Sequence, residues 1–197
     1  MFRNMMEALS LINPVGILKA VNKWFHRSRP TVDFEYGLGF PENDYCQFRV
    51  DKNTHTNCLF FRLGINNTGK TRIDEADVRV EKIEIIDTAG KRQKVRSSPF
   101  FLHWANEDTD NSRSIYFNTP VFIDLIFTNE SRHGMAFFFF KGKHKSSGIK
   151  EFLTPGKWVV TIKLLGREIV PIEKEVLIDF DGRWNQIRLE LRELSKN

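Results

Sequence analysis

The amino-acid sequence predicts an all-β fold in which two antiparallel sheets form a sandwich behind a short amphipathic helical segment. Three observations lead to this prediction. From residue 31 almost to the end, apolar and polar residues alternate with the period of two that half-buried strands require. Turn-forming residues separate about eight or nine such runs, and no helical periodicity interrupts them. The composition, with 41% hydrophobic residues and 18 phenylalanines, supplies enough apolar surface for one core.

The first 30 residues are predicted to form a basic amphipathic arm. Apolar residues at spacings of three and four indicate helix between residues 5 and 25, and Asn13-Pro14 divides this stretch into two short helices. We expect one side of the arm to bury against a membrane or a partner protein and its cations to meet anionic groups. The buried side comprises Leu11, Ile17, Leu18, Val21, Trp24 and Phe25, and the cations are Lys19, Lys23, Arg27 and Arg29.

We expect that the arm does not cross a membrane. Its longest uncharged stretch, Ala8 to Leu18, falls well short of the roughly 20 apolar residues that a spanning helix needs. The arm also lacks the small-residue cleavage site of a signal peptide, so we expect the mature chain to keep it.

The net charge of +5 is concentrated in this arm. Residues 1–30 contain five basic side chains and one acidic side chain, whereas the remaining residues contain 25 basic and 24 acidic side chains. Such an arm attracts an anionic membrane or an acidic protein surface. Because the nearly neutral body offers no basic stripe, we do not expect nucleic acid as a partner.

Residues 31–184 are predicted to form the sandwich. Alternation from Val32 to Tyr36 and from Leu59 to Ile65 marks two strands, and the turn residues 66–70 follow the second strand. The apolar residues then change parity between Val80 and Ile83, which indicates a β-bulge near Glu81-Lys82.

Residues 185–197 form a C-terminal extension with two possible structures. A helix would gather Ile187, Leu191 and Leu194 on one side, whereas a strand would place Ile187, Leu189 and Leu191 on one face. The content of Glu, Leu and Arg favours the helix.

The consecutive residues Phe137, Phe138, Phe139 and Phe140 depart from the alternation. Phenylalanine on both faces of a strand predicts either that both faces are covered or that one face is a patch for a partner. The arm and the C-terminal segment are the two candidates for an internal cover. The basic residues 141–145 that follow are typical of a protected sheet edge.

No motif in the sequence points to catalysis, and we expect that the protein is not an enzyme. It has no G-x-S-x-G, H-E-x-x-H or P-loop motif, and its five histidines lack metal-ligand spacing. The acidic run Glu107–Asn111 lacks the glycine and the glutamate of a calcium loop. Asp179 and Asp181 share one strand face and are interpreted as polar surface. We therefore expect no catalytic residue, metal, cofactor or small-molecule substrate.

Cys46 and Cys58 are too few for a disulfide framework and belong to no C-x-x-C motif. We expect free thiols in a reducing compartment. A bridge across neighbouring strands is the alternative.

Several short motifs resemble those of immunoglobulin-like sandwich domains in prokaryotic adhesion-type proteins and proteins of uncharacterised function. They are Phe61–Lys70 with Ala76–Val80, Phe101–Ala105, Leu153–Trp158 and Gly182–Trp184, and they span about residues 30–184. The resemblance implies an immunoglobulin-like two-sheet antiparallel sandwich, and it brings no catalytic residues. In that group the sandwich often follows a membrane-proximal helix and a basic junction similar to Arg27–Pro30.

These observations favour a non-catalytic binding or scaffolding module that its arm attaches peripherally to a membrane surface or to a partner protein. The basic residues beyond the apolar segment favour the cytoplasmic side, at the inner face of the membrane. The alternative is a structural subunit of a larger assembly, in which the arm and the strand Phe137–Phe140 are docking surfaces.

Overall fold

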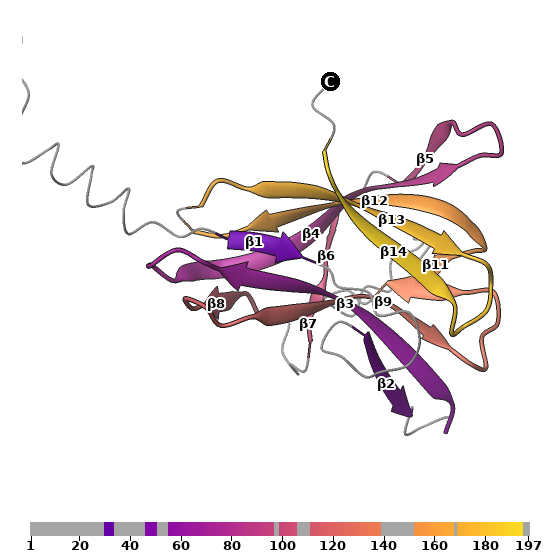
Figure 1. Cartoon of the computed structure of the whole chain (residues 1–197), viewed down its shortest axis with the longest axis horizontal. Helices are drawn as coiled ribbons and strands as arrows, with labels where there is room; N and C mark the ends of the chain where they lie inside the picture. Colours follow the sequence, from indigo (N-terminus) through magenta and orange to yellow (C-terminus); the bar gives the residue numbers. More distant parts are fainter. Residues whose placement is uncertain are drawn as a thin grey trace, which may run out of the picture.

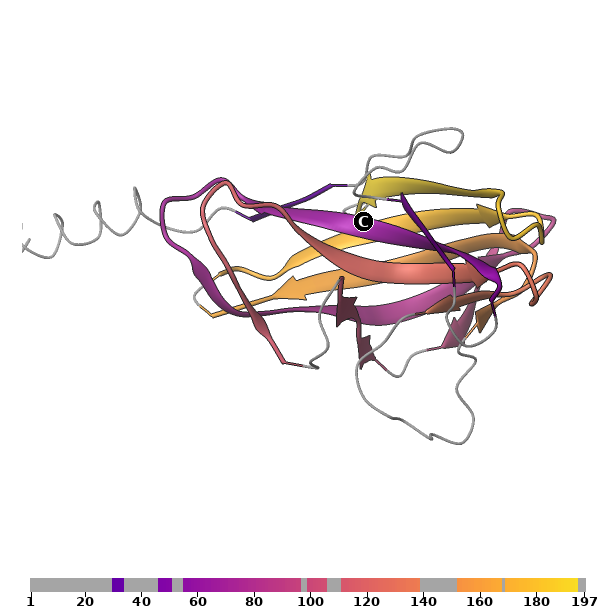
Figure 2. The ribbon, with the colours of Figure 1, turned by 90° about the horizontal axis from the view of Figure 1, so that it is seen from below.

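The structure is a computed structural model of the chain, and it describes residues 30–33, 46–50, 55–96, 99–105, 111–138, 152–167 and 169–194. Every regular element among these residues is a β-strand, and the strands form two antiparallel sheets (Figures 1 and 2). The predicted all-β fold with two antiparallel sheets is therefore confirmed. The predicted helical arm lies outside the described residues.

The first sheet is built around β3 and β9, which pair with each other. One edge of β3 carries β1 and β2 in succession, and the far edge of β9 carries β7 and β10. The strands are β1 (Pro30–Asp33), β2 (Cys46–Val50), β3 (Asn57–Asn67), β7 (His103–Trp104), β9 (Val121–Asn129), β10 (Ala136–Phe138) and β11 (Phe152–Leu153).

The second sheet has the strand order β14-β13-β12-β4-β5, and β6 and β8 also pair with β4. The strands are β4 (Ile73–Ile86), β5 (Arg92–Arg96), β6 (Phe100–Phe101), β8 (Arg113–Ile115), β12 (Gly156–Leu165), β13 (Ile172–Phe180) and β14 (Ile187–Glu193). The helix favoured for the C-terminal extension is wrong, and the strand alternative is correct. Tertiary burial overrides helix propensity here, because pairing with β13 places Ile187 and Leu189 in the core.

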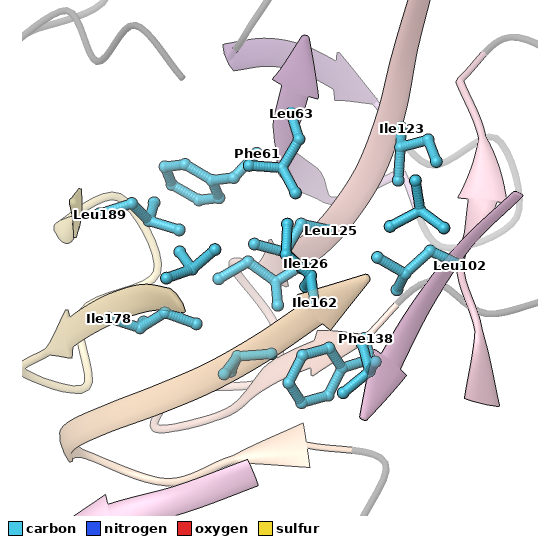
Figure 3. Close-up of a cluster of buried hydrophobic side chains, with 14 of the residues drawn as sticks. Phe61, Leu63, Leu102, Ile123, Leu125, Ile126, Phe138, Ile162, Ile178 and Leu189 are labelled. Carbon is cyan, nitrogen blue, oxygen red and sulfur yellow. The ribbon is translucent and has the colours of Figure 1, made fainter. Parts of the chain in front are cut away.

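The core lies between the two sheets and takes one face of each (Figure 3). Phe61 and Leu63 of β3 come from one sheet, and Ile162 and Ile178 of β12 and β13 come from the other. Burial stabilises the fold by roughly 1.5–3 kcal/mol for each large apolar side chain.

The bulge predicted near Glu81-Lys82 is confirmed. Thr161 of β12 lies opposite Lys82, but the next residue, Ile162, lies opposite Val80, so Glu81 is the extra residue of β4. The extra residue changes the parity of the strand, which allows both Val80 and Ile83 to enter the core.

Candidate interaction surface

The structure separates the predicted phenylalanine patch into two environments. Phe138 is 3% exposed and meets the ring of Phe100 edge-on, with 5.5 Å between ring centroids. It is a core residue and not part of a surface patch. Phe137 is half-buried on the opposite, outer face of the first sheet. Phe139 and Phe140 lie outside the described residues, as do the ten predicted contact residues of the arm.

Phe137 belongs to a row of four phenylalanines on the outer face of the first sheet, one each from β3, β9, β10 and β11. We call Phe60, Phe127, Phe137 and Phe152 the phenylalanine row. Adjacent members are paired across the strands, and their ring centroids are separated by 5.5, 5.2 and 6.0 Å. Cross-strand aromatic pairs of this kind each stabilise a sheet by about 0.2–1 kcal/mol relative to alanine.

Strand alternation explains why these rings face outward. The neighbours Phe61, Ile126, Phe138 and Leu153 are buried in the core, so the adjacent phenylalanine must lie on the other face. Apolar doublets in the sequence indicate this arrangement for each strand separately. The doublets do not specify which strands lie side by side, and for that reason sequence analysis missed the row.

Two arginines lie over rings of the row. The guanidinium carbon of Arg49 is 5.5 Å from the centroid of Phe60, and that of Arg132 is 5.1 Å from the centroid of Phe137. Both arginines are exposed, and a cation–π contact at such a site stabilises by about 0.5–1 kcal/mol. The row is therefore an apolar ridge with a positive charge near Phe60 and another near Phe137.

The orientation of the rings restricts what this ridge can bind. The planes of Phe60 and Phe127 differ by 20°, and those of Phe127 and Phe137 differ by 24°. The rings therefore stack on one another, whereas a nucleobase needs an open ring face. An apolar protein surface that carries acidic groups fits the ridge and its arginines better than single-stranded nucleic acid does.

Arg62 of β3 and Asp124 of β9 form a buried ion pair. Arg62 is two residues after Phe60 and therefore lies on the same face of β3 as the phenylalanine row. Arg62 Nε donates to Asp124 Oδ1 at 2.7 Å, and the two side chains are only 1% and 5% exposed. Sequence analysis missed this pair because its members are 62 residues apart. The available signal is Arg62 itself, a charged residue between the uncharged, mainly apolar runs 58–61 and 63–65.

The two aspartates that the sequence places near each other, Asp179 and Asp181, each have a basic partner. Asp179 lies 3.9 Å from Lys157, and Asp181 accepts hydrogen bonds from Arg183. The side chain of Arg183 lowers the pKa of Asp181 below its usual value. Within the described part of the chain, no group of three or more His, Cys, Asp or Glu side chains could hold a metal ion.

Cys58 is buried, and its sulfur accepts a hydrogen bond from Asn129 at 3.2 Å. Cys46 lies opposite Phe61 in the pairing of β2 with β3, three residues away from Cys58 along the strand direction. This offset corresponds to roughly 10 Å, beyond the ~7 Å limit between the Cα atoms of a disulfide. The alternative of a bridge between the two cysteines is therefore wrong.

Comparison with known proteins yields no relative for this chain. No protein-family model, no curated protein sequence and no solved structure matches it. Across the described ranges, no helix has the length and apolar character that are needed to cross a membrane.

The buried ion pair leads to a stability prediction. The change Asp124→Ala leaves the charge of Arg62 buried without this carboxylate, so we expect it to lower the free energy of unfolding by about 3–5 kcal/mol. Asp179→Ala removes an exposed partner of Lys157, and we expect a loss of less than about 1 kcal/mol. Urea unfolding of both variants measures the difference. Equal losses would show that Asp124 makes no special contribution.

Proposed function

We propose that the protein is a non-catalytic binding or scaffolding module that its N-terminal arm attaches to an anionic membrane surface. The observation that carries this proposal is the distribution of charge. Five of the 30 basic side chains and only one of the 25 acidic side chains belong to residues 1–30. Near an anionic bilayer each arm cation contributes about 1 kcal/mol, and the apolar side of the arm adds to the affinity.

The body supports this proposal because many of its charged side chains pair with one another. Arg92 donates to both carboxylate oxygens of Glu175, at 2.6 and 3.0 Å, and lies 3.8 Å from Glu84. Lys163 pairs with Glu173 at 2.5 Å. Internal pairing of this kind leaves the arm as the segment with the surplus of positive charge.

We also propose that the sandwich is immunoglobulin-like. Immunoglobulin-type sheets contain strands A, B, E and D in one layer and G, F and C in the other, with C′ beside C in the variable type. The strand orders β1-β3-β9-β7 and β13-β12-β4-β5 follow this arrangement. The remaining strands, including β14 next to β13, are additions to it.

The proposed location is the cytoplasmic face of the membrane. Basic residues that follow an apolar segment favour retention on that side. The cations Lys19, Lys23, Arg27 and Arg29 all lie after the uncharged stretch that ends at Leu18.

A second candidate function is that of a subunit in a larger assembly. The phenylalanine row favours it, because four half-buried rings flanked by arginines form a ridge suited to another protein surface. A second copy of the chain is the simplest partner to test.

Vesicle co-sedimentation of the full chain tests the leading function. We expect binding to vesicles that contain phosphatidylserine, weaker binding at higher salt, and no binding to phosphatidylcholine alone. Replacing Lys19, Lys23, Arg27 and Arg29 by Gln removes about 4 kcal/mol, so the affinity should fall at least about 100-fold. The matched control replaces four exposed cations of the body, Lys91, Lys94, Lys157 and Arg188, by Gln and should retain much of the affinity. Equal losses in the two variants would argue against the arm.

Native mass measurement over a range of protein concentrations tests the second function. If the row joins copies of the chain, the mass of the wild type should rise with concentration, and Phe127→Ser at the centre of the row should abolish the rise. Phe101→Ser is the control, because Phe101 is 38% exposed and lies outside the row. A wild type that stays monomeric throughout contradicts self-assembly.

A further inference from the structure

Three connections meet at the end of the sandwich where β1 begins (Figures 1 and 2). They are residues 68–72 between β3 and β4, residues 116–120 between β8 and β9, and the described residues 166, 167 and 169–171 between β12 and β13. We call these three connections, together with Pro30, the β1 end.

Backbone pairing ties the connections and the start of β1 together. Pro30 lies opposite Asn67, and Asn67 forms an isolated bridge with Phe117. The backbone N–H of Arg167 donates to the carbonyl oxygen of Asp74 at 2.8 Å. The third connection is therefore attached to the beginning of β4.

The β1 end exposes an unusual amount of apolar surface. Tyr116 is 55% exposed, Phe117 is 51% exposed and Val170 is 79% exposed. Among the large hydrophobic residues of the described chain, only Val50 elsewhere exceeds half exposure, at 52%. A concentration of exposed apolar side chains at one place marks a site of contact with another surface.

The connections hold these side chains in defined positions. Asn118 has a φ of 49° and closes the turn that presents Tyr116 and Phe117. The side chain of Arg72, in the connection from β3 to β4, pairs with Asp74 at 2.8 Å. In the connection from β12 to β13, a Cβ atom on Gly166 would lie only 2.6 Å from Cγ2 of Ile73, so this segment packs tightly on β4.

Charged side chains of both signs lie at this end. Lys70, Arg72 and Arg167 are exposed, and Arg72 pairs with Asp74 at 2.8 Å while Arg167 lies 4.0 Å from Glu75. The basic arm ends at Pro30 in the sequence, and Pro30 lies at the end of the sandwich that exposes Tyr116, Phe117 and Val170.

We propose that the β1 end is a second lipid-contacting surface, in which Tyr116, Phe117 and Val170 enter the interface of an anionic bilayer beside the arm. This proposal rests on the proposed membrane attachment and adds the orientation of the sandwich. Aromatic rings are favoured at the level of the lipid headgroups, and nearby cations meet lipid phosphates. The 29 residues that precede Pro30 carry the surplus of positive charge, which makes a lipid surface a better match here than an apolar protein.

The test compares full-length variants on phosphatidylserine-containing vesicles. The triple variant Tyr116→Ser, Phe117→Ser, Val170→Ser removes the apolar contact, and we expect at least about 10-fold weaker binding at low and at high salt. The control Val50→Ser, Val95→Ser removes exposed apolar side chains elsewhere and should bind within about two-fold of the wild type. Thermal unfolding confirms that each variant is folded.

The salt dependence of vesicle binding distinguishes the apolar contact of the β1 end from the electrostatic contact of the arm. The triple variant keeps every arm cation and should retain the salt sensitivity of the wild type, whereas neutralising the arm should strongly reduce that sensitivity. A triple variant that binds as tightly as the wild type overturns the lipid contact of the β1 end and leaves the membrane function intact. A wild type that binds no vesicles overturns both proposals.

Discussion

Burial of one face of each sheet against the other is the constraint on which the rest of the structure depends. The long strands β3, β4, β9 and β12 supply most of this interface, and their inward residues are almost fully buried. The constraint fixes the register of the strands that contribute to the core, because a shift by one residue would turn their apolar side chains outward. The bulge at Glu81 meets the same requirement. Because of the extra residue, the side chains of both Val80 and Ile83 point into the core although they are three positions apart.

Fixing the inner faces also determines what the outer faces present. Once Phe61 and Phe138 are in the core, Phe60 and Phe137 must lie outside, where they form the phenylalanine row with their neighbours. The connections at the ends of the strands have more freedom. At the β1 end, Asn118 has a left-handed backbone conformation, and the apolar side chains of Tyr116, Phe117 and Val170 are exposed.

The sequence contained enough information for the fold class but not for the surfaces. Period-two alternation and the change of parity after Val80 are local signals, so they predicted the strands and the bulge. The C-terminal strand was misjudged because its partner β13 determines its structure. The phenylalanine row, the pair Arg62–Asp124 and the exposed apolar residues at the β1 end all involve residues that are distant in the sequence. Pairing and topology create these sites, and neither can be read from local patterns.

The two proposals together place the sandwich with its β1 end toward the bilayer and its other end away from it. The most direct measurement is amide hydrogen exchange of the full chain with and without phosphatidylserine-containing vesicles. We expect slower exchange in residues 68–72, 116–120, 166–167 and 169–171 on vesicles, and unchanged exchange in the opposite turns 87–91 and 181–186. Protection that appears in those opposite turns, or no protection at the β1 end while the chain is bound, would contradict this orientation.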